Sequence, residues 1–129
     1  LLRRLLRTAR PGALVGLFSD FRQLGAMESA LLRKLGQRVE LILGFAVDPI
    51  ERELPPAGRY PLVDDSGQIQ WIDTSQRAHR DRWVEHYRLR RGAAESAAGA
   101  SRAHGVELGT ERDPVESLTA ALGRRRQIA

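Results

Sequence analysis

The sequence feature that most constrains this chain is a short apolar run, Ala13–Phe18, that ends abruptly in Ser19 and Asp20. A nearly continuous apolar run of this length is typical of a strand buried on both faces, as in a parallel sheet covered by helices. In open sheets of this kind the carboxyl ends of the strands face the ligand crevice. Asp20 is therefore a candidate site residue by position alone, with the Ser19 hydroxyl beside it.

A second apolar run, 39–47, predicts another buried parallel strand, and it too ends in a carboxylate, Asp48. Between the two strands, leucines recur at helical spacing over about 23–35, and Gly36 follows as the predicted C′ residue of that helix. The connection is long enough for a right-handed crossover between parallel strands.

The remaining chain predicts one α/β domain over 1–129, with a Rossmann-like, three-layer fold. Its three parallel strands are expected in chain order, with helices on both sides. Arg59–Asp73 predicts a hairpin insertion because two short alternating runs flank a turn sequence. The other expected elements are a helix over 1–9, a strand over 13–18, a long helix over 75–103, a strand over 106–109 and a final helix capped by Asp113, with Val115 on its inner face.

Composition narrows the function classes. The 129 residues carry a formal net charge of +5, but 20 of the 21 basic residues are arginines, spread along the chain among acidic residues. That distribution favours a solvated surface over a nucleic-acid patch. The absence of cysteine excludes disulfides and thiolate catalysis within this chain and favours a cytoplasmic setting. No apolar run has the length that spans a bilayer.

Two adjacent strands that end in Asp20 and Asp48 would place two carboxylates near one crevice. Hard divalent ions such as Mg²⁺ take oxygen ligands of this kind. The alternative is that each aspartate caps the turn or helix that follows its strand, and for Asp48, which precedes Pro49, this is the favoured interpretation. The stretch Asp73–Arg77 is interpreted in the same way, as the N-terminal cap of the long helix.

The chain resembles a known family in several places. Leu14–Phe21 is similar to the fourth strand and following metal-site loop of a von Willebrand factor A domain. Further motifs, in the same order, resemble the bacterial family of unknown function numbered fifty-eight, which carries a von Willebrand factor A-like domain and is often encoded beside MoxR-type AAA+ ATPases. These motifs are Arg10-Pro11-Gly12, Asp48–Pro55, Gly58-Arg59-Tyr60, Asp73-Thr74-Ser75 and Asp113-Pro114-Val115-Glu116.

The resemblance implies that the chain is the C-terminal half of such a domain, without the strand that ends in DxSxS. Ser19 and Asp20 then match part of a metal-ion-dependent adhesion site, with Phe21 where many relatives have glycine. Asp48 matches the family's own motif and remains a further candidate. The resemblance implies Mg²⁺ in the complete domain, and we expect none in this fragment.

We therefore expect a non-enzymatic protein-interaction module, with a MoxR-type AAA+ ATPase as a partner and self-association through the exposed strand 13–18. Two other hypotheses stay open. One is a metal-dependent hydrolase or nuclease that uses the strand-end carboxylates, although two-metal hydrolysis needs more convergent acids than Asp20 and Asp48. The other is a nucleic-acid binder that uses Arg80, Arg88 and Arg91 of the long helix.

Overall fold

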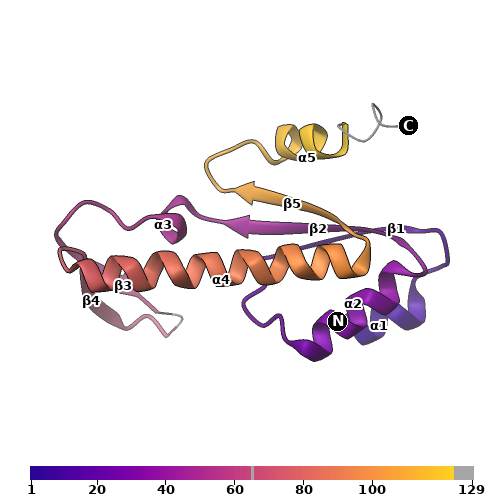
Figure 1. The fold of residues 1–129 in the computed structure, drawn as a ribbon, viewed down its shortest axis with the longest axis horizontal. Coiled ribbons are helices and arrows are strands. Elements are labelled where there is room, and N and C mark those ends of the chain that lie inside the picture. The colour runs from indigo at the N-terminus through magenta and orange to yellow at the C-terminus, as the bar shows by residue number, and fades with distance from the viewer. Residues whose placement is uncertain (65, 124–129) are drawn as a thin grey trace.

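A computed structural model describes residues 1–64 and 66–123 (Figure 1). The elements, in chain order, are α1 (Leu2–Thr8), β1 (Leu14–Ser19), α2 (Ala26–Gly36), β2 (Glu40–Val47), α3 (Pro49–Arg52), β3 (Arg59–Val63), β4 (Ile69–Asp73), α4 (Arg77–Ser101), β5 (His104–Gly109) and α5 (Pro114–Gly123).

The predicted α/β fold class is confirmed. β1, β2 and β5 form a parallel sheet in that order, and β3 pairs antiparallel with β4 in a separate hairpin. Leu17 lies opposite Leu43, which in turn lies opposite Gly105. The third parallel strand begins two residues earlier than the predicted Val106, because His104 and Gly105 pair with β2 despite their weak strand propensity.

The main core lies between one face of this sheet and the helices α1, α2 and α4. Alanines line the sheet-facing side of α4 and let the long helix approach closely, so the two glycines of α4 do not interrupt it. Leucines of α1 pack against the same core. The buried residues of this cluster are Leu32, Leu35, Val39, Leu41, Leu43, Ala97 and Ala98.

Gly36 has a different role from the one predicted. It is the last residue within α2 and does not adopt a positive φ, whereas Gln37 caps the helix in a right-handed conformation. A Cβ at Gly36 would lie 1.9 Å from the backbone carbonyl oxygen of Ser101, at the end of α4. Glycine is therefore required because two helix ends meet here, and not because the chain must turn left-handed.

The long helix is shorter at both ends than predicted, and the interpretation of Asp73 as its cap was wrong. Gln76 occupies the N-cap position of α4 and makes no side-chain capping bond. The Asp73 carboxylate instead accepts hydrogen bonds from the backbone N–H (2.9 Å) and hydroxyl (2.6 Å) of Ser75. Aspartate commonly bonds the backbone two residues ahead, and here that local bond forms before the helix begins.

Thr74 connects the hairpin to the segment before it and is fully buried. Its hydroxyl donates to the Pro56 carbonyl at 2.8 Å and accepts from the Gly58 N–H at 3.1 Å. Nothing in the sequence predicted this residue, because its partners are distant in the chain.

We expect Thr74→Val to lower the free energy of unfolding by about 2 kcal/mol, because valine leaves these buried backbone groups without a partner. Thr74→Ser keeps the hydroxyl and should lose much less. Urea unfolding of the two variants measures the difference. Equal losses would mean that the hydroxyl contributes nothing beyond packing.

The last helix, α5, begins as predicted but lies more exposed. The Asp113 carboxylate accepts from the backbone N–H of Val115 at 2.7 Å and of Glu116 at 3.2 Å. Val115, predicted on the inner face, is 68% exposed, because α5 contacts only β5 on the side away from α4 (Figure 1). Among residues 1–64 and 66–123, no helix has the length and apolarity needed to cross a membrane.

Candidate functional site

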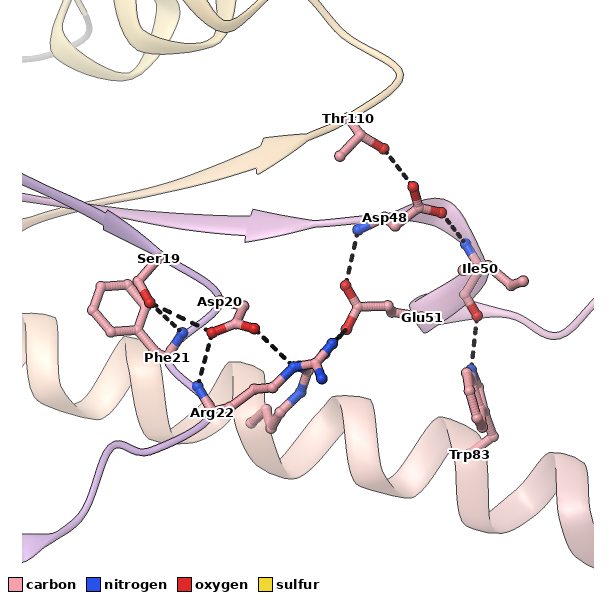
Figure 2. Close-up of polar contacts among 10 residues, drawn as sticks. Ser19, Asp20, Phe21, Arg22, Asp48, Ile50, Glu51, Trp83 and Thr110 are labelled. Carbon is pink, nitrogen blue, oxygen red and sulfur yellow. Dashed lines mark hydrogen bonds and ion pairs between the residues drawn. The ribbon is translucent and has the colours of Figure 1, made fainter. Parts of the chain in front are cut away.

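Ser19 and Asp20 lie at the carboxyl end of β1, where the sequence places them (Figure 2). The Asp20 carboxylate accepts from the backbone N–H of Arg22 at 3.2 Å and pairs with the Nε of Arg22 at 2.7 Å. The Ser19 hydroxyl lies 3.4 Å from the same carboxylate and accepts from the N–H of Phe21 at 3.1 Å. Both side chains therefore stabilise the turn that leaves the strand.

Phe21 takes a backbone conformation that bulky residues seldom adopt, with a φ of 50°. Its ring is half-buried and lies 6.5 Å from the ring of Phe45, centroid to centroid. Packing of the ring against the core compensates for the unfavourable backbone. This turn is the point at which the chain leaves the sheet and passes toward α2.

Asp48 lies at the carboxyl end of β2 and is the N-cap of α3. One carboxylate oxygen accepts from the N–H of Ile50 at 3.0 Å, and the other accepts from the Thr110 hydroxyl at 2.8 Å (Figure 2). These bonds favour the ionised form and hold the pKa of Asp48 below its usual value, the bond from Ile50 having the largest effect.

A lowered pKa in the folded state implies that Asp48 stabilises the fold above its ordinary pKa and that this contribution is lost as pH falls. We expect stability to decline from about pH 5 downward, and Asp48→Asn to make that decline shallower. Urea unfolding across this pH range measures both slopes. An identical pH dependence in the variant would show that the lowered pKa of Asp48 has no bearing on stability.

Glu51 connects the two strand ends and was not predicted as a site residue. Its carboxylate accepts from the Asp48 N–H at 3.2 Å, completing a capping box, and also pairs with Arg90 of α4. The Nη2 of Arg22 lies 4.0 Å from the same Glu51 oxygen that Arg90 contacts. The spacing of Asp48 and Glu51 was a readable capping-box signal, but no sequence signal linked either residue to Arg90.

The two predicted carboxylates do not converge on one position. Figure 2 shows Asp20 directed toward Arg22 and Asp48 toward Ile50 and Thr110, with Glu51 between them. In the described part of the chain, no group of three or more histidine, aspartate or glutamate side chains is placed to hold a metal ion. Ser19 and Asp20 offer two oxygens from one turn, one of them on a carboxylate already paired with a guanidinium, and so do not fit a complete Mg²⁺ site.

The helix arginines of the nucleic-acid hypothesis are engaged within the chain. Arg80 donates to the carbonyls of Thr74 and Pro55, at 2.7 and 2.8 Å. Arg88 forms a two-pronged pair with Glu85 on its own helix, at 2.7 Å for each contact. Arg91 pairs with glutamates on α4 and β5. These contacts favour structural roles for all three arginines over a common cationic surface.

Comparison with known proteins gives one finding. A family model described as "Protein of unknown function DUF58" matches residues 2–93, a span that includes both strand ends and most of α4. No curated protein and no solved structure matches the chain. Since the family model covers well over half of the sequence, the chain belongs to this family of unknown function.

Proposed function

We propose that the chain is a non-enzymatic protein-interaction module that binds an extended polypeptide segment along the open edge of β1. The observation that carries this proposal is the combination of an edge strand with exposed apolar side chains. β1 lies at one end of the strand order, and Leu14 and Phe18 on it are 64% and 54% exposed. Open apolar strand edges are sites where another strand pairs.

The backbone of β1 supports this proposal. Glu40 donates its N–H to the Ala13 carbonyl at 2.8 Å. In a strand, the N–H and C=O of one residue point to the same side, and successive residues alternate. The polar backbone groups of Leu14, Gly16 and Phe18 therefore point toward the open edge, where an added strand would receive them. We refer to this edge, with its exposed Leu14 and Phe18 side chains, as the β1 edge surface.

The Phe18 side chain extends the β1 edge surface over the sheet face opposite the main core. A Cβ at Gly44 of β2 would lie 2.2 Å from the Phe18 ring and 3.1 Å from Leu108 of β5. The ring thus lies across the glycine, and the face it covers is apolar from β1 to β5. An added strand would bury this surface and gain stability from it.

A second copy of the chain is the occupant we expect when no other protein is present, because it carries the same edge and can pair with itself symmetrically. A MoxR-type AAA+ ATPase is the partner that the family resemblance suggests, in a cytoplasmic setting and within a von Willebrand factor A-like domain. Sedimentation of the unmodified chain and of variants at the β1 edge surface tests the proposal directly.

The metal of an adhesion-type site forms no part of this mechanism, because Ser19 and Asp20 do not fit it alone. We expect millimolar Mg²⁺ to leave the unfolding midpoint of this chain unchanged, since a ligand stabilises a fold only by binding to it. Thermal unfolding with Mg²⁺ and with a chelator provides the measurement. A Mg²⁺-dependent rise in midpoint that Asp20→Asn abolishes would contradict the expectation and restore the metal site.

A further inference from the structure

A pocket of about 480 Å³ lies on the α4 side of the strand ends, away from the β1 edge surface. It joins the turn after β1, the short helix α3 and the middle of α4. Its volume is in the range of small-molecule sites. The residues that line it are Arg22, Ile50, Glu51, Trp83, His86 and Arg90.

The charge of this pocket is unusual for a cavity between packed helices. Two guanidinium groups, from Arg22 and Arg90, line it against one carboxylate, from Glu51. The Arg90 side chain is only 11% exposed, and its buried Nε has no hydrogen-bond partner within residues 1–64 and 66–123. A buried polar nitrogen without a partner is uncommon and calls for a ligand, water or ion to satisfy it.

Arg22 forms the accessible side of the pocket. Its side chain is 65% exposed, and its Nε is engaged by Asp20. Its Nη2 lies 4.0 Å from Glu51, too far for a hydrogen bond. The planar fork of a guanidinium can hold a second carboxylate on its remaining edge. Trp83 closes the pocket from α4, where its indole N–H donates to the Ile50 carbonyl at 2.7 Å (Figure 2).

We propose that this pocket binds the carboxylate group of a ligand between Arg22 and Arg90, with Glu51 as the internal carboxylate that it displaces or joins. Glu51 shows the chemistry that the pocket accepts, because its carboxylate already lies between the two guanidinium groups. A carboxylate is therefore favoured over a bulkier phosphate. It can come from a small carboxylic acid or from an acidic side chain of a protein, and the experiment separates these sources.

The test measures binding to the full chain by titration calorimetry, with succinate and with capped Gly-Glu-Gly and Gly-Gln-Gly peptides as probes. We expect the Glu peptide or succinate to bind and the Gln peptide to fail. Arg22→Gln should weaken that binding by about tenfold, since a charge-assisted pair is lost. Glu51→Gln should strengthen it by a similar factor, because it removes the competing charge and keeps an oxygen for the Asp48 N–H.

Arg88→Gln is the matched control, because Arg88 lies on the same helix but outside the pocket and pairs with Glu85. It should bind the probes as the unmodified chain does. Binding of succinate alone assigns the pocket to small acids, and binding of the Glu peptide assigns it to a protein side chain. The proposal is overturned if neither probe binds, if inorganic phosphate binds as tightly as the carboxylates, or if Arg22→Gln leaves binding unchanged.

This inference does not rest on the proposed function. Arg22 and Glu51 lie outside Leu14–Ser19, so their substitution should leave self-association unchanged in sedimentation. Loss of peptide binding with intact self-association, or the reverse, therefore shows which of the two proposals has failed. Should Glu51→Gln unfold the chain, Arg22→Gln still decides the matter, since the Arg22 side chain is mostly solvent-exposed.

Discussion

Gly36→Ala is expected to destabilise the fold by about 3 kcal/mol, a large effect for the addition of one methyl group. The new Cβ would lie 1.9 Å from the Ser101 carbonyl oxygen, and that oxygen belongs to backbone that cannot rotate away. Ser101 is itself buried, and its hydroxyl donates to the Ala97 carbonyl at 2.6 Å. The ends of α2 and α4 would therefore have to separate.

Gly92→Ala provides the control, because Gly92 lies within α4 and a Cβ there meets nothing within 4 Å. Alanine should stabilise the helix at that position by up to about 1 kcal/mol. Urea unfolding of both variants gives the comparison. Similar stabilities for the two variants would mean that the contact between Gly36 and Ser101 is looser than the structure shows.

The order of the sheet and its parallel direction could be predicted from the sequence, because the apolar runs that became β1 and β2 are nearly continuous. Both end in an aspartate at the predicted edge, Asp20 and Asp48. The first residues of β5 could not be predicted, since His104 and Gly105 become strand only through pairing with β2. The role of Gly36 was missed for a related reason: only tertiary structure brings Ser101 to it.

The candidate site was predictable only in part. Position at a strand end identifies Asp20 and Asp48, but their partners decide what they do, and those partners come from other segments. Thr110 lies far along the chain from Asp48, and Arg90 lies far from Glu51. Ion pairs between such distant residues leave no periodicity in a single sequence. The pocket between α3 and α4 could therefore be found only in the structure.

The second large effect is expected at the β1 edge surface. Replacing both Leu14 and Phe18 with lysine should weaken self-association by about 100-fold, because two apolar contacts are lost and like charges meet across the paired edges. Stability of the single chain should change little, since both side chains are more than half exposed. Leu89→Lys is the control, because Leu89 is 58% exposed on α4, away from the edge.

The central claim is that the open edge of β1 is an interaction surface, and sedimentation velocity of the unmodified chain over a range of concentrations tests it most directly. We predict a sedimentation coefficient that rises with concentration, that persists in Leu89→Lys and that disappears when Leu14 and Phe18 are both lysine. A unmodified chain that stays monomeric at every concentration, or a double variant that associates as strongly as the unmodified chain, would contradict the claim.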